Sequence, residues 1–122
     1  MESHRVKIIW FMLPMLLWAE ESFISDYEYG EMLYNNPRGV SCAKCHGISG
    51  EGKIIAEYKD KQGKKTIEGS DIRKDTLEVM IKSVNTYHKI MPRYYLTDEE
   101  VKAIYEYLEK KNHLQSANQS VL

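Results

Sequence analysis

A five-residue motif, Cys42-Ala43-Lys44-Cys45-His46, constrains this chain more than any other feature of its sequence. The pattern Cys-x-x-Cys-His is typical of covalent attachment of a c-type haem. Two thiols three residues apart can each add to a vinyl group along one edge of the porphyrin. The histidine that follows then lies beneath the ring, where an imidazole nitrogen can reach the iron. The motif therefore predicts one covalently bound haem c, attached through Cys42 and Cys45, with His46 as the proximal iron ligand.

Paired cysteines have two other common uses. They form thioredoxin-like redox pairs, and they supply half of a zinc site. A thioredoxin-like pair opens a long helix, whereas Gly47, Gly50 and Gly52 follow this motif and disfavour a helix. Zinc sites usually bring a second ligand pair at regular spacing, and the remaining histidines do not provide one. These contrasts favour haem attachment, with a haem-free thiol–disulfide protein as the alternative.

The first nineteen residues have the layout of a secretory signal peptide. Arg5 and Lys7 form a basic start, and an uncharged, mostly apolar run over residues 8–19 ends at Ala19. This run is shorter than the roughly 20 apolar residues that span a bilayer, so cleavage after Ala19 is favoured over a membrane anchor. An uncleaved leader could still hold the protein at a membrane surface. Haem is attached outside the cytoplasm, so the leader and the motif together predict an exported, periplasmic protein.

The rest of the chain is long enough for one small domain. We expect the domain over residues 20–111 and a flexible, polar C-terminal tail over residues 112–122. The formal net charge of the 122-residue chain is −1, and nothing in its charge pattern suggests nucleic acid binding. A domain of this size buries a limited core, and a covalently held macrocycle would supply much of what is missing. We therefore expect the haem-free protein to be largely unfolded.

Three helices are predicted from caps and from apolar residues at spacings of three and four. The expected ranges are residues 25–35, 75–85 and 97–111. Each range starts with a residue pair typical of a capping box: Ser25 with Glu28, Asp75 with Glu78, and Thr97 with Glu100. No segment shows the alternation of a strand, so residues 47–74 are expected to form a long surface loop organised around the haem.

In this arrangement the chain resembles the class I cytochromes c, a family of small monohaem proteins, over about residues 25–111. Gly30 and Tyr34 correspond to a glycine and an aromatic residue on the family's first helix. Ile104 and Tyr107 resemble the aliphatic and aromatic residues with which the last helix crosses that glycine. The resemblance implies an all-α class I cytochrome c fold, with three main helices and long loops wrapped around one covalently bound haem.

The resemblance also implies a methionine as the distal iron ligand, from a loop before the last helix and often in a Met-Pro dipeptide. Met91-Pro92 occupies that place, and Pro92 biases Met91 toward an extended conformation. Met80 competes with it, but Met80 fits the apolar stripe of the second predicted helix. His88 is the rival ligand, because it lies three residues from Met91 and imidazole binds iron well.

The chain departs from the family pattern after the haem histidine. The family commonly has a proline there, and the carbonyl group of that proline accepts a hydrogen bond from the imidazole. This sequence has no proline between His46 and Met91. Such bonds fix the ring and raise the basicity of the ligand. An acceptor for His46 is therefore expected, but the sequence does not assign it.

Ligation by a histidine and a thioether leaves no iron position for oxygen or peroxide, and methionine favours a high reduction potential. The resemblance thus implies a soluble, monomeric one-electron carrier, not an enzyme, that serves redox protein partners in a respiratory chain. It would bind no nucleic acid and would reach a membrane only through partner complexes. A displaceable distal ligand would instead favour a haem enzyme or a sensor. A further hypothesis is a cytochrome subunit of a larger oxidoreductase complex.

Overall fold

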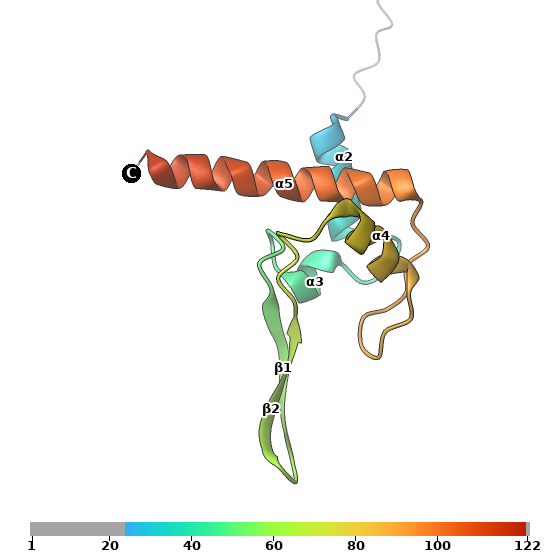
Figure 1. The fold of residues 1–122 in the computed structure, drawn as a ribbon, viewed down its shortest axis with the longest axis vertical. Coiled ribbons are helices and arrows are strands. Elements are labelled where there is room, and N and C mark those ends of the chain that lie inside the picture. Colours follow the sequence, from blue (N-terminus) through green and yellow to red (C-terminus); the bar gives the residue numbers. More distant parts are fainter. Residues whose placement is uncertain (1–23, 122) are drawn as a thin grey trace, which may run out of the picture.

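The computed structural model describes residues 24–121, so the predicted signal peptide (residues 1–19) lies outside the described residues. The elements, in chain order, are α2 (Asp26–Asn35), α3 (Cys42–His46), β1 (Lys53–Asp60), β2 (Gly63–Gly69), α4 (Leu77–Asn85) and α5 (Asp98–Ser120). Figure 1 shows α2 crossing α5, with α3 and α4 on one side of α5 and the β1–β2 hairpin projecting away from the helices. Across residues 24–121, no helix has both the length and the apolar character needed to cross a membrane.

Helices α2 and α5 begin where the sequence predicts them. In each, the side chain of the capping residue accepts a hydrogen bond from the backbone N–H three residues later. The glutamate at that position accepts one in return from the backbone N–H of the cap, which completes the capping box. The two pairs are the predicted ones: Ser25 with Glu28, and Thr97 with Glu100.

The start of α4 differs from the prediction by one residue. Thr76, and not Asp75, is the capping residue, and its hydroxyl accepts a hydrogen bond from the backbone N–H of Val79 at 3.2 Å. Asp and Thr both cap helices well, and the two residues are adjacent in the sequence. Thr76 has the extended backbone conformation that a cap requires, and the predicted pairing of Asp75 with Glu78 does not start the helix.

Helix α5 is longer than predicted. It continues to Ser120, where the sequence suggested an irregular tail from residue 112 onward. Polar contacts hold this part to the loop after the motif: Asn112 Nδ2 donates to the carbonyl oxygen of Ser49 at 3.0 Å, and Ser49 Oγ bonds to Gln115 Oε1 at 3.3 Å. The helix was predicted from apolar residues at spacings of three and four, and polar residues do not contribute to that pattern. The predicted helix therefore stopped before the observed one.

Residues 53–69 form an antiparallel hairpin where a loop was predicted, so the all-α prediction is only partly right. Asp60 pairs with Gly63 across a two-residue turn, in which the Asp60 carboxylate accepts a hydrogen bond from the N–H of Gln62 at 2.7 Å. Gly63 has a φ of 115°, a conformation that favours glycine. Side chains on both faces of the hairpin are largely exposed, so no apolar–polar alternation marks these strands in the sequence.

The core lies where α2 crosses α5. Tyr34 is fully buried and Tyr107 is 2% exposed, with their ring centroids 5.8 Å apart. Gly30 permits the close approach, since a Cβ there would overlap the carbonyl oxygen of Ala103 and would lie 2.6 Å from Tyr107 Cβ. Ile104 is also buried. These four positions are the ones that the resemblance placed at the crossing, and their burial agrees with it.

An ion pair ties the segment before the motif to the start of α5. The Arg38 guanidinium contacts both carboxylate oxygens of Glu100, at 2.7 and 2.8 Å, and also donates to the carbonyl oxygen of Tyr95. Arg38 itself has a φ of 60°, in the left-handed region. The hydrogen bond from Arg38, followed by that from the backbone N–H of Thr97, lowers the pKa of Glu100 to about 2.

Glu100 should therefore make the stability of the protein depend on pH in the acid range. Its pKa is lower in the folded state than the ordinary value of 4.5, so its contribution is complete above about pH 4.5 and is lost as the pH falls toward 2. We expect Glu100→Gln, which can still form the capping box, to lower the unfolding midpoint at pH 7 and to approach the parent protein near pH 2. The check is denaturant unfolding across this range, with the exposed Glu99→Gln as control. A difference from the parent that stays constant from pH 7 to pH 2 would contradict it.

Candidate haem site

The motif folds as one short helical turn, α3, which was not predicted. It ends at Gly47, whose φ of 88° is strained for other residue types. The hydroxyl of buried Tyr34 donates to the carbonyl oxygen of Gly47 at 2.6 Å and so fastens the end of the turn to α2. The two cysteines are three residues apart on this turn, and both line the same cavity as His46.

This cavity has a volume of about 390 Å³, within the range of roughly 300–1,000 Å³ typical of small-molecule and cofactor sites. Its wall comes from α3, the base of the hairpin, α4, α5 and the segment before α5. Many lining side chains are apolar members of the core, among them Met80, Val84, Tyr94, Val101 and Ile104. A mostly apolar wall with two thiols and an imidazole at one place fits a covalently attached macrocycle.

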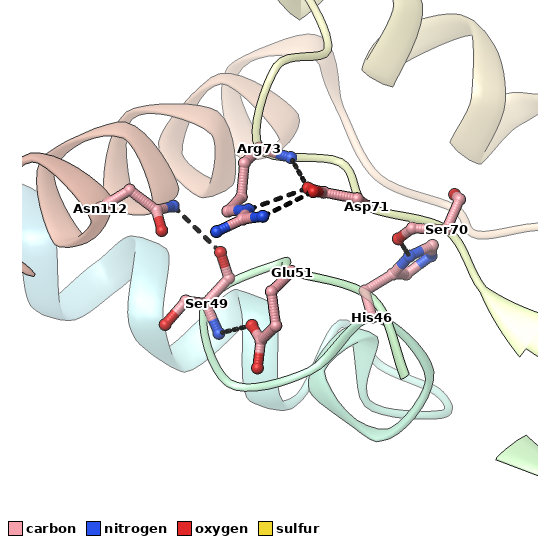
Figure 2. Close-up of polar contacts among 7 residues, drawn as sticks. All are labelled: His46, Ser49, Glu51, Ser70, Asp71, Arg73 and Asn112. Atoms are coloured by element: carbon pink, nitrogen blue, oxygen red, sulfur yellow. Dashed lines mark hydrogen bonds and ion pairs between the residues drawn. The ribbon is translucent and has the colours of Figure 1, made fainter. Parts of the chain in front are cut away.

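The carbonyl group of Ser70 supplies the acceptor that the sequence did not assign. His46 Nδ1 lies 2.8 Å from the Ser70 carbonyl oxygen (Figure 2). A carbonyl oxygen only accepts, so the hydrogen sits on Nδ1 and the lone pair on Nε2. That is the tautomer a metal-ligating histidine needs at Nε2.

Close packing brings Ser70 to the motif. Gly69 ends β2 against the backbone of Cys45, and a Cβ on Gly69 would overlap the Cys45 carbonyl oxygen. The segment beyond Ser70 is held by Arg73, which bonds both carboxylate oxygens of Asp71 at 3.0 and 2.7 Å (Figure 2). The end of the hairpin thus supplies the acceptor for His46 that the family pattern commonly assigns to a proline and that the sequence left unassigned.

A second set of polar contacts fixes the loop after the motif. The Glu51 carboxylate accepts a hydrogen bond from the Ser49 N–H at 2.8 Å, and Ser49 in turn accepts one from Asn112 on α5 (Figure 2). The backbone N–H of Glu51 itself, and then that of Ser49, lower the pKa of the Glu51 carboxyl group. These bonds keep the loop against α5 and leave the motif facing the cavity.

Both candidates for the distal ligand line the cavity, together with Met80 and Pro92. Met91 is partly buried and packs against the core. His88 is engaged elsewhere, because its Nε2 lies 2.7 Å from the carbonyl oxygen of Ser83 and must therefore carry the hydrogen. Met80 is buried on α4, as its place in the apolar stripe predicted.

The buried environment of Cys42 argues against a thiol–disulfide function. Cys42 and Cys45 form no disulfide. Burial raises the pKa of the Cys42 thiol to about 11, whereas a redox-active cysteine needs a lowered pKa to be a thiolate at neutral pH. In the described part of the chain, no three His, Cys, Asp or Glu side chains gather as a metal-binding cluster.

Comparison with known families decides the assignment. The family model for cytochrome c matches residues 27–111, which is more than half of the chain. The chain belongs to the cytochrome c family. Neither a curated protein nor a solved structure gave a significant match. As a member of this family, this cytochrome c carries covalently bound haem c, for which Cys42 and Cys45 have the right spacing, and it is a haem-binding electron-transfer protein.

Two site features of this cytochrome c were missed by the sequence analysis. The acceptor at Ser70 is a backbone carbonyl oxygen 24 residues from His46, and a backbone contact of this kind cannot be recognised from residue types. Ile55 lies where the strand register shifts between Ile54 and Ala56, and it lines the cavity. The place of Ile55 at the cavity depends on the hairpin. The sequence signal for that hairpin was the two-residue turn between Asp60 and Gly63.

Proposed function

We propose that this cytochrome c is a soluble one-electron carrier whose haem iron is ligated by His46 and Met91. The observation that carries the proposal is that Cys42, Cys45, His46 and Met91 all line one cavity. The Ser70 bond supports His46 as a ligand through Nε2, since it fixes the tautomer. Haem c, when bound, supplies a one-electron iron couple.

The residues around the cavity suit electron transfer better than turnover of a substrate. With His46 and Met91 both holding the iron, no position would remain for oxygen, peroxide or another reactant. The apolar wall limits access of water and favours the less charged, reduced state. A thioether ligand favours that state further and raises the potential relative to two imidazoles. If His46 and Met91 both held the iron in either oxidation state, little rearrangement would be needed on electron exchange.

Haem attachment occurs outside the cytoplasm, so we also propose that the chain is exported by its first nineteen residues and works as a monomer in the periplasm. Its donor and acceptor would be redox proteins of a respiratory chain, and contact with a membrane would come through them. Members of the cytochrome c family are typically exported electron carriers, which supports this proposal.

His88 gives the second candidate function, because it lines the same cavity as Met91. A protein whose distal position is open, or is filled by a histidine that dissociates readily, would act as a haem enzyme or sensor. Ligation through His88 Nε2 would break its bond to Ser83, and this disfavours it as the resident ligand.

Two variants test the distal ligand. We expect Met91→Ala to lose the weak absorption band that iron–thioether ligation produces near the red end of the oxidised spectrum, to have a lower potential and to bind carbon monoxide rapidly. His88→Ala should keep the band and resist carbon monoxide. The opposite pattern, with the band retained in Met91→Ala, would assign the distal position to another residue and refute the ligation proposed here.

A further inference from the structure

The hairpin reaches far from the helices, and within residues 24–121 most of its length contacts no other element. In Figure 1 its turn lies well away from α5, and only its base adjoins α3. Residues at this base, among them Ile55 and Gly69, line the cavity. Its side chains are largely exposed on both faces, including the large apolar residues Ile54, Ile55 and Tyr58. A segment that contributes this little to the core is free to serve another purpose.

The charge at the end of the hairpin is concentrated and basic. Residues 59–65, which we call the hairpin tip, contain four lysines and one aspartate, so the tip carries a formal charge of +3 on a chain whose net charge is −1. Asp60 is already paired with Lys65 at 2.6 Å. Among residues 24–121, the other three tip lysines have no ion-pair partner: Lys59, Lys61 and Lys64.

We propose that the hairpin is a docking arm for a redox protein with an acidic surface; this inference rests on the carrier function proposed above. The basic tip would steer a carboxylate-rich face, since complementary charge raises association rates by about tenfold or more at low salt. Tyr58, which pairs with Lys65 at the start of the tip, and Ile55, nearer the base of the hairpin, offer apolar contact area of the kind found at the centre of protein interfaces. Because Ile55 also lines the cavity, a partner held along the arm would lie beside the haem.

Lysines on an exposed hairpin also discourage edge-to-edge aggregation, which charge of either sign achieves. The excess of one sign at the tip is what favours a partner of the opposite sign. An anionic membrane is disfavoured as that partner, because Glu57 and Glu68 lie on the same two strands and would meet the lipid head groups. The arm therefore fits a protein surface whose negative charge is confined to one patch.

The test compares two holoproteins with the same change in net charge. The tip variant is Lys59→Glu/Lys61→Glu/Lys64→Glu. The control variant changes exposed lysines on α4 and α5: Lys82→Glu/Lys102→Glu/Lys110→Glu. One probe is poly-L-glutamate, measured by equilibrium binding. The other is a small copper protein with a surface carboxylate cluster, measured as the rate at which it oxidises the reduced haem at low and high salt.

We expect the tip variant to lose at least tenfold in both measurements at low salt, the control variant to lose less than twofold, and high salt to remove the difference. Equal losses in the two variants would show that only net charge matters and would overturn the docking arm. So would binding to phosphatidylglycerol vesicles without binding to poly-L-glutamate, which would indicate a membrane.

An uncharged oxidant separates this inference from the carrier proposal. Benzoquinone is small enough to reach the haem without the hairpin, so both variants should be oxidised as fast as the parent protein. Failure of the parent protein to be oxidised would refute the carrier function, whereas poly-L-glutamate binding would still decide whether the arm is a docking surface.

Discussion

Without covalent haem, the Cys42→Ala/Cys45→Ala protein is expected to be largely unfolded. The cavity that the haem would fill measures about 390 Å³. Without the macrocycle, the side chains that line this space lose the packing partner that would shield them from water. The whole free energy of unfolding of a small domain is about 5–15 kcal/mol. The apolar wall of the cavity, which includes Val84 and Ile104, would also be left without a partner.

Far-ultraviolet circular dichroism and thermal unfolding measure this directly. The parent holoprotein should unfold in one cooperative transition, and the double variant should show little helix and no sharp transition. Met91→Ala is the matched control, because it keeps both thioether attachment points and the macrocycle in place. A cooperative, near-native transition in the haem-free variant would contradict the account of the cavity.

Replacing Gly30 with alanine should lower the stability of the holoprotein by about 3 kcal/mol. A Cβ at this position would overlap the carbonyl oxygen of Ala103 and would lie 2.6 Å from Tyr107 Cβ, so α2 and α5 would have to separate. Overpacking of this kind typically costs 1–3 kcal/mol, and backbone contacts place it at the upper end of that range. The loss is expected even though alanine has a higher helix propensity than glycine by about 1 kcal/mol.

The midpoint of denaturant unfolding of the holoprotein tests this expectation. Gly39→Ala is the control, because a Cβ there would lie 3.4 Å from the nearest atom of Tyr94, close to ordinary contact. If the two variants had the same midpoint as the parent protein, the crossing of α2 and α5 would not depend on Gly30.

Local signals made much of the fold predictable. The starts of α2 and α5 follow from capping boxes, in which a serine or threonine and a glutamate three residues later satisfy each other's backbone N–H groups. The crossing of these helices follows from a glycine that leaves room and from large residues, such as Tyr107, that fill it. These features depend on residues only a few positions apart in the chain, so they can be recognised from the sequence alone.

What could not be predicted depends on contacts between distant residues or on exposed structure. The hairpin has no buried face, so its strands lack the alternation by which strands are recognised. The far end of α5 is fixed by polar contacts to Ser49, 63 residues before Asn112. In the candidate site, the motif predicts the two cysteines and His46, but the Ser70 acceptor depends on how the hairpin returns to Cys45.

The most direct test of the central claim is the optical spectrum of the exported, purified protein in its oxidised and reduced states, together with a haem-stained denaturing gel. The account predicts a haem band that survives denaturation, a low-spin spectrum in both states, and in the oxidised state the weak band of iron–thioether ligation. A gel without covalent haem, or a high-spin spectrum that changes at once on addition of carbon monoxide, would contradict a carrier ligated by His46 and Met91.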